Sequence, residues 1–573
     1  MTASLTLTRS ANAATKVLWV LLLLFFVYIV AFSAFFLLSS YEDLVKWYTG
    51  LNDCFYKHEY WANDFFTPAR KATGNYYCIG ALIASLPCLL YCFRQLKKKA
   101  HNAREVRISL SLSYLATAIA CIVFAAIAWA WGKSLVAPSN DEVFSAVNCA
   151  ALPPFQTLSY YMLPNNHILF NLLNNVVFHT VADKVLSGRV ISLFCYLGLV
   201  LVVFSWLGNV LQNRWLAFIA TIAIALQFPV WGFGFQARGY ELLALMEWVV
   251  LISLFQYRKT SDQKWLQVMA AASIAGYFTI PVFLYFHAAV LAFTVFSGIV
   301  NKRFDSRFWK SQFVVGLLVF LLYLPCLCFS GREAITGNAW VAPQTYSQLW
   351  EDAGQMWHNY MDYCFCNPVN GQYVVDTLLF LLPVCLMFFR RNDIARSLGL
   401  FYCAMWGTTI LLTMVMKVFP IDRSLTGQFS IILALTIYTL GLLLGNLAKW
   451  LHVKRAAAVA LPVILVLLSV NFVLKGRKYV SHYLCHFVVN EWRATVVDDG
   501  ISNIPPGSSV GFSNESFFWF YMCKQYGYKV DKCSTGTEDY YVKATNEPFP
   551  AGMDGRYVAI KKVTEFYEIF KRK

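Results

Sequence analysis

The sequence predicts a polytopic α-helical membrane protein, and three properties of the chain point to it. Its 573 residues are 58% hydrophobic, and their mean hydropathy is +0.52. Only 14% of them are charged, whereas a soluble domain has about 25%. The hydrophobic residues also gather in runs close to the ~20 residues that an α-helix needs to cross a bilayer. An α-helix is stable in lipid because its backbone N–H and C=O groups form hydrogen bonds with one another within the same segment.

Thirteen apolar segments approach this spanning length. The first follows Arg9 and Lys16, but its apolar run of about 23 residues exceeds the roughly 7–15 of a signal peptide, and no small-residue cleavage site follows. We therefore interpret it as a retained anchor. Two later segments meet at Pro281, where a short turn is expected. The sequence thus predicts about 13 transmembrane helices, at residues 17–39, 76–94, 111–132, 190–211, 215–232, 240–256, 265–280, 281–300, 313–330, 374–389, 397–416, 429–448 and 456–474.

Lysine and arginine residues predict the orientation of these helices. If the N-terminus is cytoplasmic, the inner segments carry 22 of the 47 basic residues and the outer loops carry 11. The other 14 lie in the tail after residue 474, which an odd number of spans places outside. We therefore expect a multi-pass protein of the cytoplasmic (inner) membrane with an extracytoplasmic tail. The net charge of +16 then reflects mostly cytoplasmic loops, so no nucleic-acid partner is expected.

The tail, residues 476–573, is predicted to be a small extracytoplasmic α/β domain. It has an entry turn at Pro505-Pro506-Gly507, after which candidate strands and helices alternate. Cys523 and Cys533 could form a disulfide in an oxidising compartment, and the sequence leaves this open. Strands are expected at residues 509–512, 529–533, 540–543 and 556–561, and helices at 514–526 and 564–572.

Four predicted extracytoplasmic segments are long enough to carry a site, whereas the cytoplasmic loops are short. They are residues 40–75, a first long loop at 133–189, a second at 331–373, and the tail from 475. The aromatic residues of the second loop could cap a sugar site or lie on the membrane surface. Within the first loop, residues 166–187 show apolar residues at helical spacing. Its polar residues favour an amphipathic helix on the membrane surface over a span; they are Asn171, Asn174, Asn175, His179 and Asp183.

Two adjacent carboxylates, Asp141 and Glu142, follow the third apolar segment. Neighbouring acids whose environments differ can divide the work of proton transfer, one abstracting a proton and the other holding a ligand or the first acid. The alternative is an acidic pair at a solvated helix start, where carboxylates complement the helix dipole. The dipeptide alone leaves both interpretations open.

Further motifs follow the acid pair in order, all at the predicted outer boundary: His167-Ile168-Leu169, then Arg189 at the start of the next span, then Arg238-Gly239-Tyr240 at the next outer turn. With Asp141-Glu142, this series resembles the C-type (GT-C) integral-membrane glycosyltransferases, especially the branch of the protein O-mannosyltransferases and lipid A aminoarabinose transferases. By this resemblance, residues 111–475 would be a GT-C-like catalytic domain.

Two departures from the family pattern stand out. The acid pair follows the third span where the family has it after the first, so residues 1–110 look like an extra N-terminal transmembrane helix pair. Adding two spans preserves the topology. The proline that usually follows the family's histidine is replaced by Ile168, which leaves the role of His167 open.

The resemblance implies a role for each of these residues. Asp141 would be the general base that deprotonates the acceptor, so that the acceptor attacks the anomeric carbon with inversion, and Glu142 would position the acceptor or that base. His167 would orient a substrate, although a structural histidine is an equal reading. The donor phosphate would be bound by Arg189, Arg238 and Tyr240. Arg423, in Ile421-Asp422-Arg423-Ser424, is a further arginine at the predicted outer boundary that could grip the phosphate. The alternatives are snorkelling to lipid headgroups for the arginines and an aromatic belt anchor for Tyr240.

The predicted compartment limits the chemical class of the sugar donor, because nucleotide sugars stay in the cytoplasm. A sugar transferred outside must arrive on a carrier that crosses the bilayer, which a polyprenyl phosphate does. We therefore expect a glycosyltransferase that moves a sugar from a polyprenyl-phosphate donor to a glycan, lipid or protein acceptor, with membrane lipids as its surroundings. No cofactor is expected, and a divalent metal is possible but not indicated.

The alternative is a transporter or flippase of a lipid-linked or anionic substrate. It would need polar residues at mid-span and paired broken helices, whereas the acids and arginines here cluster at the outer boundary. Glu247, His287 and Asp376 do lie near or within spans. They are functional candidates by position, with hydrogen bonds between helices as the alternative.

Overall fold

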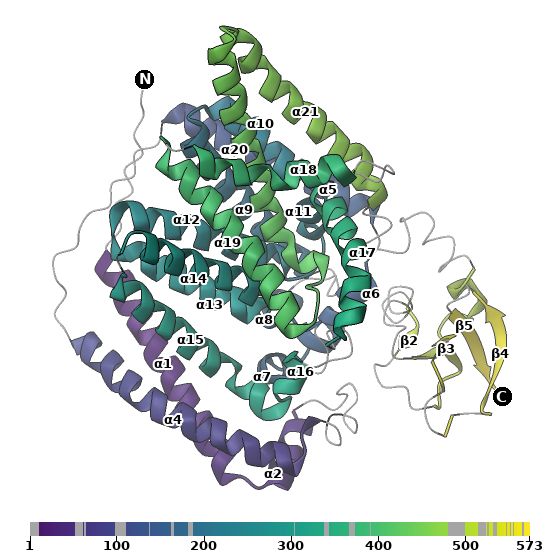
Figure 1. Ribbon diagram of the computed structural model, residues 1–573. Helices are drawn as coiled ribbons and strands as arrows, with labels where there is room; N and C mark the ends of the chain where they lie inside the picture. The colour runs from purple at the N-terminus through teal and green to yellow at the C-terminus, as the bar shows by residue number, and fades with distance from the viewer. Residues whose placement is uncertain are drawn as a thin grey trace.

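The computed structural model confirms a polytopic helical membrane protein with a small C-terminal sheet (Figure 1). It describes residues 11–51, 61, 65–97, 111–136, 138–161, 165–180, 187–302, 304–336, 343–365, 373–389, 391–479, 499–513, 519, 523, 527–530, 536–545, 547–549, 552–553, 555–563 and 567–573.

Ten helices of the described chain are long and apolar enough to cross a membrane. Each coincides with a segment predicted from hydropathy. They are α1 (Ala11–Leu38), α4 (Pro68–Lys97), α5 (Leu112–Leu135), α9 (Gly188–Leu211), α12 (Tyr240–Thr260), α14 (Phe283–Val300), α15 (Ser306–Phe329), α19 (Asp393–Met416), α20 (Thr426–Trp450) and α21 (Lys454–Tyr479).

The other three predicted spans are helical but short or broken. Helices α10 (Arg214–Ala225) and α11 (Phe228–Gly234) meet at a bend of 70°, because Pro229 starts a new helix and cannot continue the old one. Helix α13 (Gln263–Thr279) has 17 residues, and α18 (Tyr373–Leu381) passes into the 3-10 helix η3 (Leu382–Phe388). The described residues therefore contain ten spans, or eleven with the bent pair, where about 13 were predicted.

Short helices cover one end of the bundle. They are α2 (Tyr41–Thr49), α6 (Asn140–Ser145), the π-helix η2 (Ala146–Ala150), α7 (Pro154–Ser159), α8 (Ile168–Phe178), α16 (Arg332–Thr336), α17 (Tyr346–Phe365) and the 3-10 helix η4 (Asp422–Leu425). The turn between α20 and α21 lies at the opposite end of the molecule (Figure 1).

Helix α8 is the amphipathic helix predicted within residues 166–187, but its polar side faces the protein. Asn171, Asn174 and Asn175 are buried, and the Asn175 side chain donates hydrogen bonds to the carbonyls of Ala150 and Leu152. Leu173 and Val176 point outward. This arrangement suits a helix whose outer face meets lipid instead of water. Residues 181–186, including Asp183, lie outside the described residues.

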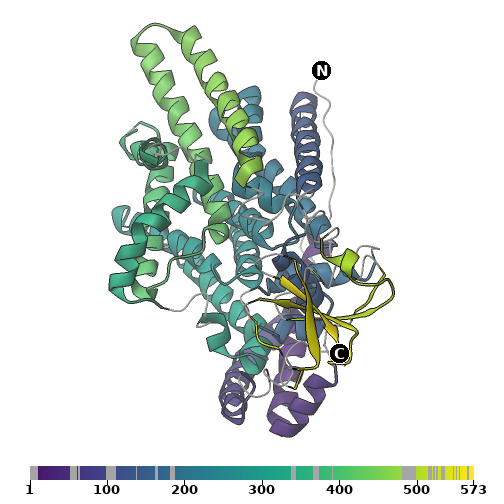
Figure 2. The same ribbon diagram turned by 90° about the vertical axis from the view of Figure 1, so that its right-hand side faces the viewer.

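The tail forms a five-stranded mixed sheet in the order β2-β1-β3-β5-β4. Its strands are β1 (Ser509–Phe512), β2 (Lys529–Val530), β3 (Tyr540–Ala544), β4 (Tyr557–Lys562) and β5 (Tyr567–Arg572), preceded by the 3-10 helix η7 (Ile501–Asn503). Figure 2 shows the sheet far from the turn between α20 and α21.

Four of the predicted tail strands are confirmed, whereas the helix predicted at residues 564–572 is wrong. That segment contains β5, which pairs antiparallel with both β3 and β4. Two neighbouring strands bond its backbone on both sides, and its buried Ile569 and Phe570 pack on the sheet, so tertiary pairing overrides local propensity. Most of the helix predicted at residues 514–526 lies outside the described residues, as does Cys533, the proposed disulfide partner of Cys523.

The tail packs against the loop that carries the acid pair. Val143, Ala146 and Val147, from α6 and η2, share one buried apolar cluster with residues of the tail. The tail members of this cluster are Ile501, Ile504, Val510, Trp519, Cys523, Tyr540, Val542 and Ile569. A second apolar cluster joins α1, α2 and α4 to the end of α15, where Phe36, Tyr48 and Phe66 surround Phe329.

Candidate active site

The acid pair lies in the first turn of α6, and a capping box orients its two carboxylates differently. The hydroxyl of Ser139 accepts a hydrogen bond from the Glu142 backbone N–H at 3.3 Å. In return, the Ser139 N–H donates to Oε2 of Glu142 at 2.9 Å. This reciprocal bonding holds Glu142 inward. Glu142 is fully buried, whereas the Asp141 side chain is 42% exposed.

Glu142 is bonded on both carboxylate oxygens. Nε of Arg189 donates to its Oε1 at 2.8 Å, and an Nη donates to its Oε2 at 2.9 Å. The Ala237 N–H adds a further bond to Oε1 at 2.8 Å. Burial raises the pKa of Glu142, but the Arg189 charge and the backbone donors outweigh burial and bring this pKa below its ordinary value.

The Glu142–Arg189 pair therefore joins three segments that are distant in sequence: α6, the start of α9 and the turn before α12. Arg189 is itself buried. The predicted role of Arg189 in gripping a phosphate would require this pair to open, which would leave a buried carboxylate without its partner. Glu142 and Asp141 share the first turn of α6, so the bonds that fix Glu142 also fix the backbone that carries Asp141.

Asp141 faces two arginines. Its Oδ2 lies 3.5 Å from Nη2 of Arg238 and 3.5 Å from Nη1 of Arg423, and its Oδ1 lies 3.5 Å from the Asn165 amide nitrogen. The Arg423 side chain is 38% exposed, so this cluster is open to solvent on one side. A carboxylate and two guanidinium groups thus meet in a cluster that is partly exposed to solvent.

Arg238 is buried, and besides the Asp141 carboxylate its guanidinium group contacts three neutral oxygen atoms. Its Nη1 donates to the Ser145 hydroxyl at 3.0 Å and to the Asp141 carbonyl at 3.2 Å, and its Nη2 donates to the Tyr240 hydroxyl at 3.4 Å. Within the described chain, the Nε atoms of Arg238 and Arg423 are buried without a hydrogen-bond partner. The two arginines thus retain donors for a bound anion, in addition to their contacts with Asp141.

His167 binds the turn that carries Arg238 and Tyr240. Its Nδ1 accepts a hydrogen bond from the Gly239 N–H at 2.8 Å, and its ring lies edge-on to Tyr240 with ring centroids 4.8 Å apart. Burial first, and then the charges of Arg238 and Arg423, lower the pKa of His167 well below its ordinary value. The imidazole is therefore neutral, with its proton on Nε2 because Nδ1 is an acceptor.

Gly239 permits this close approach. A Cβ at this position would lie 2.9 Å from Cβ of His167 and 2.9 Å from Cγ2 of Thr279, closer than real Cβ atoms approach a neighbour. The backbone of the turn can therefore reach the imidazole only because residue 239 has no side chain.

Several site residues were not predicted from the sequence. Ser145 and Asn165 contact Arg238 and Asp141, and the backbone N–H groups of Ala237 and Gly239 bind Glu142 and His167. Serine, asparagine and backbone groups carry no sequence signal that separates them from ordinary loop residues.

The outer loop 331–373 contacts the segment that carries Arg423. The Tyr360 hydroxyl of α17 donates to the Pro420 carbonyl at 2.6 Å, and the Tyr363 ring packs edge-on against Phe228 of α11.

The ionisable residues within spans lie apart from this cluster. His287 bonds the Tyr277 hydroxyl at 2.9 Å and Gln312 at 2.8 Å, which are hydrogen bonds between helices. Glu247 is buried with its carboxylate against Gly427, and Asp376 is buried in α18. Among the described residues, no group of three or more His, Cys, Asp or Glu side chains is arranged to hold a metal ion.

Fold and site together define a class: a polytopic helical membrane protein with an acid–arginine cluster at one end of its helical bundle. No protein-family model matches the sequence, and no curated protein matches it. Solved structures do match by shape. One is the arabinosyltransferase EmbB from Mycobacterium smegmatis, with 13% identity and a TM-score of 0.41 over 87% of this chain.

Two further similar structures are of ArnT from Cupriavidus metallidurans. The one bound to undecaprenyl phosphate has 11% identity and a TM-score of 0.41, with 79% of this chain and 97% of ArnT covered. The apo structure has 12% identity and a TM-score of 0.39, with 80% and 98% covered. The match covers 49% of EmbB, so this chain spans about half the length of that protein.

Proposed function

We propose that this protein is a glycosyltransferase that moves a sugar from a polyprenyl-phosphate donor to an acceptor on the extracytoplasmic face, with inversion at the anomeric carbon. One observation carries the proposal: the Asp141 carboxylate meets the guanidinium groups of Arg238 and Arg423 in a solvent-open cluster. A base beside two phosphate-binding groups is what displacement of a phosphate by a hydroxyl requires.

The donor phosphate would compete with Asp141 for the two arginines. A phosphate offers more oxygen acceptors than a carboxylate, and Arg238 and Arg423 each have an Nε–H without a partner. Once the arginines turn to the phosphate, the Asp141 oxygens become available to the acceptor hydroxyl. Donor binding would in this way expose the base only when there is a leaving group to displace.

In the transfer step, Asp141 would take the acceptor proton while the acceptor oxygen bonds to the anomeric carbon and the bond from that carbon to the phosphate oxygen breaks. The negative charge that develops on the leaving phosphate would be stabilised by Arg238 and Arg423. Glu142 and Arg189 would hold α6 against the turn at Ala237, and His167 would hold that turn from the other side.

Hexosyl and pentosyl donors offer the same phosphate to the arginines, and a glycan, lipid or protein acceptor offers a nucleophilic oxygen or nitrogen. A transporter built from inverted repeats would have two broken spans, one in each half of the chain. The described residues contain one broken span, formed by α10 and α11.

The test is to incubate the purified protein with a panel of polyprenyl-phosphate sugars and measure donor consumption and release of polyprenyl phosphate. The proposal predicts turnover of at least one donor by the wild type. If every donor in a panel of hexosyl and pentosyl carriers binds without release of its lipid phosphate, the transferase function is wrong.

A further inference from the structure

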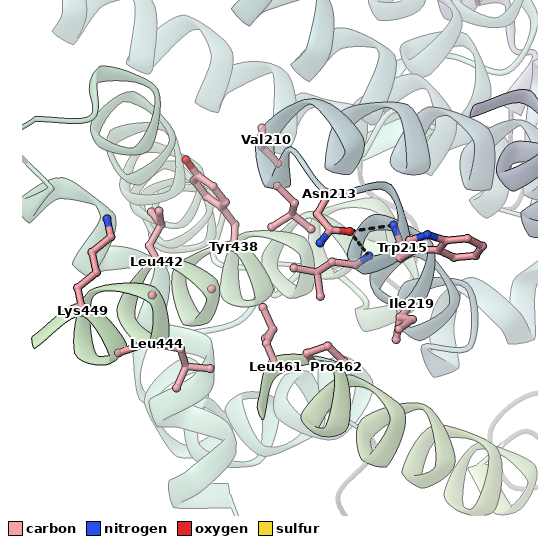
Figure 3. A pocket seen from close by; sticks show the side chains of 15 residues that line it. Val210, Asn213, Trp215, Ile219, Tyr438, Leu442, Leu444, Lys449, Leu461 and Pro462 are labelled. Atoms are coloured by element: carbon pink, nitrogen blue, oxygen red, sulfur yellow. Dashed lines mark hydrogen bonds between the residues drawn. The ribbon is translucent and has the colours of Figure 1, made fainter. Parts of the chain in front are cut away.

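A pocket opens between α10, α20 and α21, with a volume of about 470 Å³ (Figure 3). Its walls are mostly aliphatic, and Gly441, Gly445 and Ala448 of α20 leave the space that the pocket occupies. Ile219 also lines a second, almost wholly apolar pocket of about 390 Å³, which continues between α5, α10 and α21 towards Leu474. Each volume falls within the about 300–1,000 Å³ of ligand sites.

The pocket lies at the opposite membrane boundary from the acid–arginine cluster. Helix α20 begins at Thr426, directly after the segment that carries Arg423, and Lys449 lies in its last turn. At 1.5 Å per residue these positions are roughly 35 Å apart along the helix, slightly more than the ~30 Å hydrocarbon thickness of a bilayer. If the cluster faces outward, the pocket therefore opens at the inner leaflet.

The mouth of the pocket is cationic and has the residues of a membrane interface. Lys449 lies on one side of it and Trp215 on the other (Figure 3), and Arg214 stacks on the Trp215 ring with 5.5 Å between them. Trp215 and Trp450 are 61% and 77% exposed, as expected of tryptophans at headgroup level. The residues that line the pocket include no acid.

We propose that this pocket binds one acyl chain of an anionic glycerophospholipid of the inner leaflet, with its headgroup phosphate beside Lys449 at the mouth. The apolar walls match a hydrocarbon chain, and the mouth supplies positive charge without an opposing carboxylate. Basic pockets between helices on the cytoplasmic side favour such lipids, because each nearby Lys or Arg attracts an anionic headgroup. This site is separate from the proposed donor site and does not depend on the transferase function.

A larger side chain at position 445 should fill the pocket without displacing the residues that line it. A Cβ built on Gly445 meets no atom within 4 Å, so Gly445→Leu should place its side chain in the space meant for the acyl chain. Gly407 of α19 is the matched control, because its Cβ also meets no atom within 4 Å and it is exposed away from the pocket. Lys449→Gln tests the headgroup contact without altering the walls.

The experiment is native mass spectrometry of the full-length, delipidated protein with phosphatidylglycerol, with phosphatidylcholine of the same acyl chains, and with undecaprenyl phosphate. We expect phosphatidylglycerol to bind about tenfold more tightly than phosphatidylcholine, and Lys449→Gln to weaken it about fivefold. Gly445→Leu should abolish tight phosphatidylglycerol binding, and Gly407→Leu should not. Undecaprenyl phosphate binding should fall in Arg423→Ala but not in Gly445→Leu.

Three outcomes would overturn the proposal. They are equal affinity for the two phospholipids, unchanged phosphatidylglycerol binding in both Gly445→Leu and Lys449→Gln, and loss of undecaprenyl phosphate rather than phosphatidylglycerol in Gly445→Leu. The last would assign the pocket to the polyprenyl lipid. Should Gly445→Leu fail to fold by size-exclusion chromatography, Lys449→Gln at the exposed rim carries the test: weaker phosphatidylglycerol binding supports the proposal, and unchanged binding overturns it.

Discussion

The Arg189 guanidinium contacts both carboxylate oxygens of Glu142, at 2.8 and 2.9 Å, inside the protein. The pair connects the helix of Asp141 to the turn that carries Arg238, because Glu142 also accepts from the Ala237 N–H. The position of Asp141 relative to its arginines thus depends on an ion pair that itself cannot reach a substrate.

Replacing Glu142 with Gln should destabilise the protein by about 3–5 kcal/mol, because Arg189 would remain buried without its counter-charge. Thermal unfolding in detergent measures this effect. The matched control is Glu333→Gln, since Glu333 also pairs with an arginine, Arg70, but is 55% exposed. The control should change stability by no more than about 1 kcal/mol. Equal shifts for the two variants would argue against a supporting role for the buried pair.

Arg423→Ala should lower kcat/KM for the donor roughly 10- to 100-fold, the usual value of a hydrogen bond to a charged group. The KM for the acceptor should change little, because the acceptor does not carry the phosphate. Arg332→Ala serves as the control, since the Arg332 side chain is 73% exposed and bonded to Glu333. If the KM for the acceptor rises by the same factor as the KM for the donor, Arg423 does not bind the phosphate.

The stability of the protein should fall in mild acid because of His167. Its pKa is lowered in the folded state, so the unfolded chain binds a proton first as pH falls. The contribution of neutral His167 to the free energy of unfolding is then fully present above the pKa of the unfolded chain, about 6.5. It is lost as the pH falls from there towards the pKa of the folded state. His167→Asn keeps an acceptor for the Gly239 N–H and does not titrate. Melting temperatures between pH 5 and 8 should therefore depend less on pH in this variant than in the wild type.

The tail should stabilise the loop of the acid pair. Ile504 is buried in the cluster that contains Val143 and Val147, so Ile504→Asp should loosen this contact. We expect faster backbone hydrogen exchange in residues 140–150 and a loss of transfer activity. The exposed Ile560 of β4 offers a control in Ile560→Asp. Unchanged exchange in both variants would show that the tail and α6 do not support one another.

The membrane helices followed from the sequence because hydropathy and length decide them locally. The bend between α10 and α11 was not predicted, although Pro229 marks its position, because a proline in an apolar run can kink a span or end it. The C-terminal strand β5 was predicted as a helix because its pairing with β3 and β4 is a long-range contact that no local pattern reveals.

The site was predicted in part. Motif order predicted Asp141, Arg238 and Tyr240 at one boundary, and the end of a predicted span added Arg423. In the structure the Asp141 carboxylate lies 3.5 Å from both guanidinium groups, and Arg238 donates to the Tyr240 hydroxyl. The difference between the two adjacent acids could not be predicted. It arises from the capping box at Ser139 and from Arg189, which reaches Glu142 only after α8 and α9 have packed.

The most direct test of the central claim is the donor consumption of Asp141→Asn, measured with the donor that the wild type uses. The account predicts a loss of at least about 100-fold, because the amide cannot accept the acceptor proton, together with retained folding and donor binding. Asp43→Asn is the control, since Asp43 also lies in the first turn of a helix, α2, and should be dispensable. Wild-type turnover in Asp141→Asn would contradict the account.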